Sequence, residues 1–236
     1  NNIEPVYETY LAHQQERKAD PIAAIAAAAY TVLVETYPQK KEQLDAALAE
    51  SLKDIKSNES RQLGISMGTK VGKAIFALRK DDGAFQNPVV ELDNPKIPGM
   101  YQPVPPMPFV YAPFWATLST FGLKAPDQFR VQPMPGLTSD AYTQHYNEVK
   151  LKGAKANSTR TAEETAIAKY WYEFSEVGWN RIATVVAADQ KLDLYNTARL
   201  LALVNMAMAD SYIAGWDAKF FYNFWRPFTA IRAAAT

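Results

Sequence analysis

Apolar positions in the first third of the chain recur at a helical period. In residues 39–56 and 59–80 they return every three or four positions, and this spacing predicts two amphipathic helices. The expected apolar face of the second helix is the row Leu63, Met67, Val71, Ile75 and Leu78. An Ala-rich run at residues 21–34 comes before them, with Asp20 at the N-cap position and Pro21 at the first helical position. The run is shorter than the roughly 20 apolar residues that span a bilayer. We therefore expect three helices here, the first of them a core helix, and no membrane span.

The C-terminal 100 residues show the same helical period. Helices are predicted at residues 138–152, 161–175 and 179–189. A longer helix starts at the Asp193 cap and extends toward Trp225, where a proline follows two positions later. Strand-like alternation is scarce along the chain. The pattern therefore predicts the all-α class, in the form of a multi-helix bundle.

A long proline-rich segment, at about residues 84–137, separates these two helical regions. It contains 11 of the 15 prolines, which remove backbone donors and forbid regular helix through most of it. The segment also carries seven aromatic residues between Tyr101 and Phe129, and this density favours packing over solvation. We expect an ordered wrap across the helices; the alternative is an interdomain linker.

Composition narrows the function classes. The 25 basic and 25 acidic residues balance, so no global field attracts nucleic acid or an anionic membrane. The absence of cysteine excludes disulfides, thiolate metal sites and cysteine nucleophiles. Because the sequence begins at Asn1 rather than Met, we expect that an upstream segment was removed. The location stays open, with export to the periplasm or medium favoured over the cytoplasm.

The residues most indicative of chemistry lie near position 220. Lys219 and Arg226 are seven positions apart, close to two turns of an α-helix, so a continuous helix places both cations on one face. Trp216 and Asn223 fall on the same stripe. Five further aromatic residues surround them: Phe220, Phe221, Tyr222, Phe224 and Trp225. Burial among these rings makes two cations costly unless a counter-charge is present.

Two interpretations account for this pair of cations. An oxyanion bound between them removes the cost, because Arg offers a planar fork to two oxygens and Lys supplies a point charge. Alternatively, Lys219 and Arg226 reach a wet edge or pair with carboxylates of other helices. Spacing and composition leave both open.

A family resemblance favours the first interpretation. Lys219, six intervening residues, Arg226 and Pro227 are similar to the first signature of the superfamily that joins vanadium haloperoxidases and type 2 phosphatidic acid phosphatases. The neighbouring Trp216, residues 224–227 and residues 229–232 resemble the haloperoxidase branch. The resemblance covers most of the chain and is strongest from residue 155 onward.

The resemblance implies roles for specific residues. Lys219 and Arg226 hold oxygens of vanadate or phosphate, and Lys219 is also catalytic because it polarises bound peroxide. Trp216, Asn223, Trp225 and Arg232 are candidates for the wall or outer support of the site. The family's later signatures supply a Ser-Gly-His and the histidine that binds vanadium, and neither is found in this sequence.

The two histidines of this sequence, His13 and His145, precede the first signature, so we assign them no role and expect no metal ligand in the chain. Residues 1–236 are therefore expected to be the N-terminal part of a single helical haloperoxidase-like domain. The C-terminal half of the active site would come from a further segment or a second chain. We expect the 236 residues alone to be inactive.

Three functions follow as hypotheses. The first is vanadate-dependent oxidation of halide by hydrogen peroxide to hypohalous acid, with vanadate as cofactor and a small organic acceptor as final substrate. The second is an acid phosphatase that acts through a phosphohistidine. The third is a non-catalytic helical interaction module, in which Lys219 and Arg226 form salt bridges. A homo-oligomer is compatible with all three.

Overall fold

The computed structural model describes residues 3, 6–11, 13 and 15–234, which fall into two compact units, Asn1–Asp82 and Gly83–Thr236. The described residues form eight α-helices and one two-stranded sheet, which confirms the all-α class. None of the described helices is both long and apolar enough to cross a membrane. That residues 1–236 belong to a single domain stays a prediction.

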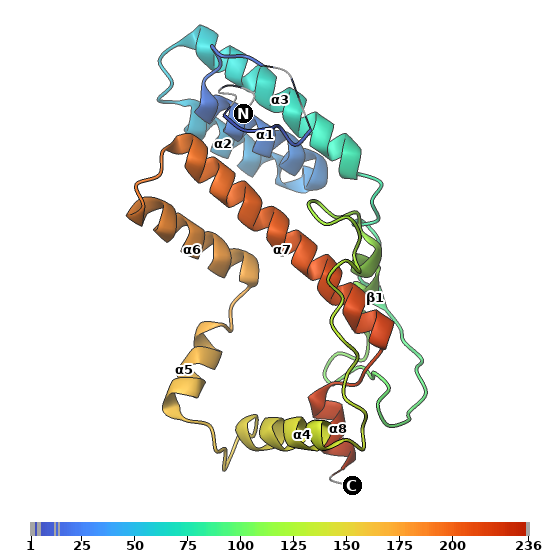
Figure 1. Ribbon diagram of the computed structural model, residues 1–236. Coiled ribbons are helices and arrows are strands. Elements are labelled where there is room, and N and C mark those ends of the chain that lie inside the picture. Colours follow the sequence, from blue (N-terminus) through green and yellow to red (C-terminus); the bar gives the residue numbers. More distant parts are fainter. Residues whose placement is uncertain (1–2, 4–5, 12, 14, 235–236) are drawn as a thin grey trace. The chain divides into compact units, whose positions relative to one another are not determined.

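The first unit contains the three predicted helices (Figure 1). Their bounds, with one short 3-10 turn, are α1 (Pro21–Thr36), η1 (Pro38–Lys40), α2 (Lys41–Leu52) and α3 (Asn58–Arg79). α1 begins where expected because the Asp20 carboxylate accepts a hydrogen bond from the Ala23 N–H at 2.9 Å. Ser57 caps α3 in the same way, at 3.2 Å from the Ser60 N–H. Local capping therefore fixes where α1 and α3 start.

Small residues hold α1 and α3 together. The buried positions of α3 include Gly64, Gly68 and Gly72, which repeat every four residues. Opposite them, α1 buries three equally spaced small residues, Ala23, Ala27 and Thr31. A Cβ atom added at Gly68 would lie 2.1 Å from the Ala24 carbonyl oxygen, so the two backbones are nearly in contact.

The α3 face expected from the sequence was the row of large residues Leu63, Met67, Val71, Ile75 and Leu78. Met67 is buried, but Leu78 is 54% exposed. The prediction of this face is therefore only partly right, because glycines make the closest approach to α1.

The second unit contains the proline-rich segment and five helices. The bounds of its elements are β1 (Val89–Val90), β2 (Val110–Tyr111), η2 (Pro113–Thr117), α4 (Asp140–Lys152), α5 (Ala162–Tyr170), α6 (Ser175–Asp189), α7 (Leu194–Tyr222) and α8 (Pro227–Ala233). β1 and β2 are antiparallel, with Val89 opposite Tyr111. This small sheet was not predicted. α6 packs along α7, to which a short loop joins it (Figure 1).

The two helix boundaries between α5 and α6 were predicted wrongly. α5 ends at Tyr170 rather than near residue 175, and α6 begins at Ser175 rather than Trp179. The residues between the two helices include three aromatic side chains, which have lower helix propensity than straight-chain residues. Trp171 also packs against Trp179 of the next helix at 5.7 Å between ring centroids, which requires the chain to turn.

The proline-rich segment packs against α7, which confirms the ordered wrap and not the linker. η2 lies on this helix. Its Trp115 ring stands 5.4 Å from the Tyr212 ring and 5.6 Å from the Trp216 ring, both on α7. The wrap therefore reaches the helix that carries the candidate site.

Candidate oxyanion site

α7 ends at Tyr222, four residues before Arg226, so the two candidate cations do not share one helix. Asn223 takes a left-handed conformation, with φ 47° and ψ 38°, and closes α7 after Tyr222. Arg226 is then extended, at φ −74° and ψ 151°, as the N-cap residue of α8. The predicted helix through Trp225 is therefore wrong, and a seven-residue helical spacing cannot explain where Lys219 and Arg226 point.

Contacts with the wrap stabilise the turn at Asn223. The Tyr101 N–H donates to the Asn223 carbonyl at 2.8 Å, and the Trp225 N–H donates to the Gly99 carbonyl at 2.9 Å. The Asn223 side chain accepts from the Asn94 amide at 2.9 Å and approaches the Met100 sulfur at 3.0 Å. Asn223 was a candidate for the wall or outer support of the site. In the structure it anchors the turn that brings Arg226 back toward Lys219.

This turn makes Lys219 and Arg226 converge on one pocket. The pocket has a cavity volume of about 490 Å³ and is walled by aromatic and apolar side chains, including Tyr101, Trp216, Tyr222 and Trp225. The Lys219 Nζ lies 5.3 Å from the centre of the Tyr101 ring, and the Arg226 guanidinium carbon lies 5.7 Å from the same centre. One buried ring therefore contacts both cations.

No carboxylate neutralises these cations within the described part of the chain. The ion pairs found there include neither Lys219 nor Arg226. The neighbouring acid, Asp217, is already paired with Arg130 through two bonds of 2.7 Å. Burial lowers the pKa of the Lys219 ammonium group, and Arg226 lowers it further, while Tyr101 acts in the opposite direction. The pocket is thus electropositive and lacks a counter-charge.

The structure brings together most, but not all, of the expected wall residues. Trp216 stands on α7 with the Lys219 Nζ 5.0 Å from its ring, and its indole N–H donates to the Tyr111 carbonyl at 3.2 Å. Trp225 lines the pocket and donates to the Tyr142 hydroxyl at 3.0 Å. Arg232 is exposed, stacks on Phe228 at 5.4 Å and does not line the pocket.

Sequence reasoning missed Tyr101, which is only 4% exposed and contacts both cations. Nothing in the sequence distinguishes it from the other aromatic residues of the wrap. It also missed Asp210, whose position as an acid within the apolar run of α7 was a signal that could have been used.

Asp210 fastens the wrap to α7 from within the interface. Its carboxylate is 6% exposed and accepts three consecutive backbone N–H groups, from Phe121 at 2.6 Å, Gly122 at 2.7 Å and Leu123 at 3.0 Å. Buried charge is stable here because these donors satisfy it. The contact fixes the wrap on the helix that carries Lys219.

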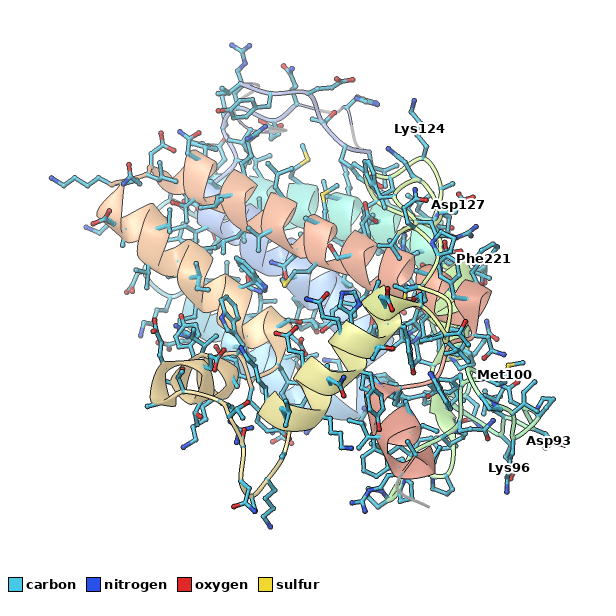
Figure 2. The ribbon with its side chains drawn as sticks, turned by 60° about the horizontal axis from the view of Figure 1, so that its bottom comes forward. Asp93, Lys96, Met100, Lys124, Asp127 and Phe221 are labelled. Atoms are coloured by element: carbon cyan, nitrogen blue, oxygen red, sulfur yellow. The ribbon has the colours of Figure 1, made fainter. Side chains whose placement is uncertain are left out.

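A second polar contact fastens the wrap nearer the pocket. The Arg130 guanidinium, held by Asp217, stacks on the Phe221 ring at 3.8 Å and has Asp127 4.0 Å away. Figure 2 shows Phe221 at the end of α7, between the loop that carries Lys124 and Asp127 and the loop that carries Met100. Wrap and helix therefore form one wall of the site.

The arrangement is suited to holding a tetrahedral oxyanion. Lys219 can donate to one oxygen and Arg226 to two. Lys219 is partly buried beside the aromatic walls of the pocket, whereas Arg226 is exposed at its edge. Within the described residues, no group of three or more His, Asp or Glu side chains could hold a metal ion. His145 lines a neighbouring pocket between α4 and α8, which shares Trp225 and three other lining residues with the pocket of Lys219 but does not include either cation.

The chain is similar in sequence to a family model and to a curated protein. A family model described as the VCPO second helical-bundle domain matches residues 199–236, which contain most of α7 and all of α8. The vanadium chloroperoxidase of Curvularia inaequalis is 32% identical over 232 residues, an alignment that covers 80% of this chain and 38% of that protein. The chain therefore spans less than half the length of this curated relative.

Two solved structures have a similar fold. A bacterial vanadium-dependent iodoperoxidase superposes with a TM-score of 0.68 at 21% identity, covering 91% of this chain and 67% of that one. A bacterial vanadium-dependent chloroperoxidase in its holo form gives a TM-score of 0.62 at 22% identity, covering 89% and 53%. At these identities the likeness concerns the fold alone.

Proposed function

The chain belongs to the vanadium-dependent haloperoxidase family, and from this premise we propose that Lys219 and Arg226 bind vanadate for the oxidation of halide by hydrogen peroxide. Hypohalous acid is the product of this reaction. The chain covers only part of the curated relative, so the activity is proposed for the whole protein that contains these residues.

One observation carries the proposal: two cations line one aromatic pocket, and neither has a carboxylate partner among the described residues. Two positive charges near one buried ring repel each other. Burial is the main cause of the lowered pKa of Lys219, and the charge of Arg226 lowers it further. A bound oxyanion turns this repulsion into two attractions. The residues present therefore fit a vanadate-sized anion.

Each residue of the pocket has a distinct task in the proposed reaction. Vanadate, when bound, acts as a Lewis acid that activates hydrogen peroxide toward halide. Arg226 fixes two anion oxygens through its planar fork, and Lys219 donates a hydrogen bond where negative charge develops. Trp216 and Trp225 form part of the wall beside the two cations.

The histidine that binds vanadium in this family is not assigned to this chain. His145 lines the pocket between α4 and α8 and not the one with Lys219. The His13 ring shares a hydrogen bond of 2.8 Å with the Thr9 hydroxyl, and we assign it no role. We place the vanadium-binding histidine in the part of the family fold that this chain does not cover.

Lys219→Met in the whole protein tests the proposal. At matched vanadate occupancy, bromide oxidation should fall roughly 100- to 1,000-fold, because one preorganised donor to the developing charge is lost. Vanadate affinity, measured by titration calorimetry, should fall roughly 10- to 100-fold. The matched control is Lys155→Met, which removes one exposed lysine charge from the loop before α5 and should change neither quantity.

Unchanged turnover and unchanged vanadate affinity in Lys219→Met would discard the role of Lys219. The phosphatase hypothesis would replace the peroxidase hypothesis if the protein hydrolysed p-nitrophenyl phosphate but did not oxidise bromide in the presence of vanadate and peroxide. Neither activity, together with no vanadate binding, would leave the chain as a structural module.

A further inference from the structure

A second pocket lies between α6 and α7 and shares a wall with the oxyanion pocket. It has a cavity volume of about 630 Å³ and is lined by Ser175 and Trp179 of α6 and by a stripe of α7: Val204, Ala207, Met208, Ser211, Tyr212 and Trp216. Trp216 also lines the pocket of Lys219 and Arg226. We name this second pocket the α6–α7 groove.

The groove opens because the two helices pack tightly at one end only. Near the connecting loop, Ala183 and Ala187 of α6 are buried, at 5% and 4% exposure. At the start of α6, the contact is instead made by the Ser175 hydroxyl, which bonds to the Tyr212 hydroxyl. Large side chains at this end, with Trp179 at 44% exposure, leave a space open to solvent.

The lining indicates the chemistry of a ligand. It carries no charged side chain, so it favours a neutral molecule. Trp179, Tyr212 and Trp216 offer three aromatic surfaces and Met208 a polarisable thioether, all of which pack well against a flat aromatic ring. The volume is in the range of small-molecule sites. A neutral ligand with a single aromatic ring, or with two fused aromatic rings, fits this lining and this volume.

The hydroxyl groups of the groove specify one polar feature of the ligand. Ser211 donates its own proton to the Ala207 carbonyl at 2.7 Å, so its oxygen is left to accept. The Ser175–Tyr212 pair likewise keeps a lone pair for a further donor. A ligand with one O–H or N–H, such as a phenol or an indole, satisfies these acceptors.

We propose that the α6–α7 groove binds an electron-rich aromatic acceptor, a phenol or an indole, beside the oxyanion pocket. This inference rests on the proposed function for its chemical step, in which the oxidant is hypohalous acid. A ring carbon attacks the halogen and the O–X bond breaks. The ring then loses its proton, which combines with the released hydroxide to form water. The Trp216 ring separates the acceptor from the site where the oxidant forms.

Binding of 1-naphthol tests the groove without any enzymatic activity. Titration of the 236-residue chain, followed by quenching of tryptophan fluorescence and by calorimetry, should give saturable binding. Ala207→Phe, which fills the groove from α7, and Trp179→Ala, which removes the opposite wall, should each weaken binding at least tenfold. The control is Ala202→Phe, an exposed position of α7 that does not line the groove and should leave affinity unchanged.

Two results would overturn the inference: no saturable binding, or binding that both folded groove variants retain at full affinity. Because one variant lies on each helix, misfolding of either, detected by circular dichroism, leaves the other to decide. In the whole protein with bromide and peroxide, binding in the groove should change the ratio of bromonaphthol isomers from the ratio that free hypobromous acid gives. Ala207→Phe should restore the ratio of free hypobromous acid. Loss of bromide oxidation with intact 1-naphthol binding would count against the proposed function alone.

Discussion

The α1–α3 pair and the C-terminal half of α7 with its wrap are both close packings, but different contacts hold them. Between α1 and α3, rows of small residues let two backbones approach almost directly. Around α7, an irregular segment is fixed by buried polar bonds to Asp210, Asp217 and Asn223. The first arrangement leaves almost no space between the two helix backbones at the glycine positions. The second arrangement leaves a pocket beside α7, with two cations that have no carboxylate partner among the described residues. Polar bonds hold the irregular segment on the helix here without filling this space with side chains.

Gly68→Ala should break the first region most severely. Its Cβ would lie 2.1 Å from the Ala24 carbonyl oxygen and 2.9 Å from the Ala27 Cβ, so the helices must separate. We expect a loss of roughly 3 kcal/mol or more in the free energy of unfolding, measured with urea. The matched control is Gly215→Ala in α7, where a Cβ meets no described atom within 4 Å. That variant should instead gain up to about 1 kcal/mol. Equal effects at the two glycines would contradict the comparison.

Asp210→Ala should break the second region by a different route. Three backbone N–H groups lose their shared acceptor, and we expect a loss of roughly 2–3 kcal/mol. Hydrogen exchange should accelerate at residues 121–123 and leave the α1–α3 helices protected. Asp189→Ala, at the exposed end of α6, serves as the control and should shift stability by less than about 0.5 kcal/mol. Unchanged exchange at residues 121–123 would remove the fastening role of Asp210.

Asp217→Asn should sharpen the comparison with a smaller effect. The Arg130–Asp217 pair is bidentate, and its side chains are only 24% and 14% exposed, so we expect a loss of about 1 kcal/mol. Asp127→Asn is the matched control, because Asp127 is 56% exposed and stands 4.0 Å from the same guanidinium. Its effect should be close to zero. A larger loss at Asp127 than at Asp217 would show that surface charge, not the bidentate contact, fastens the wrap.

The smallest expected effect is the change of stability with pH that Lys219 causes. Burial lowers the pKa of Lys219 in the folded chain, so between that pKa and the unfolded value of about 10.4 the unfolded state binds more protons. Stability relative to Lys219→Met should therefore rise with pH across this window. Added phosphate should flatten the rise, because a bound anion favours the charged lysine. A relative stability that falls with pH would contradict the lowered pKa.

Local signals predicted much of the fold. Asp20, Ser139, Thr161 and Asp193 each cap a helix near the position read from the sequence, because capping depends on neighbours within one turn. The glycine row of α3 was not predicted. The helical pattern was sought among large apolar side chains, and glycine has no side chain. Helix starts are therefore readable from sequence more reliably than helix contacts.

The sequence predicted that Lys219 and Arg226 point to one place, but not the structural reason for it. Lys219 and Arg226 converge as expected, but through the left-handed turn at Asn223 and not along a helix. That turn depends on bonds from Tyr101 and Asn94, more than 100 positions away in the chain. Such partners leave no local pattern, which is also why Tyr101 itself was missed. Arg232 is the opposite case: it is close to Arg226 in sequence, but it is exposed and does not line the pocket.

The most direct test is a crystal structure of the whole protein with vanadate bound. The account predicts anion oxygens within about 2.7–3.1 Å of both the Lys219 ammonium and the Arg226 guanidinium, with the Tyr101 ring beside them. Vanadate bound elsewhere, with Lys219 and Arg226 turned apart or each paired with a carboxylate of its own, would contradict it.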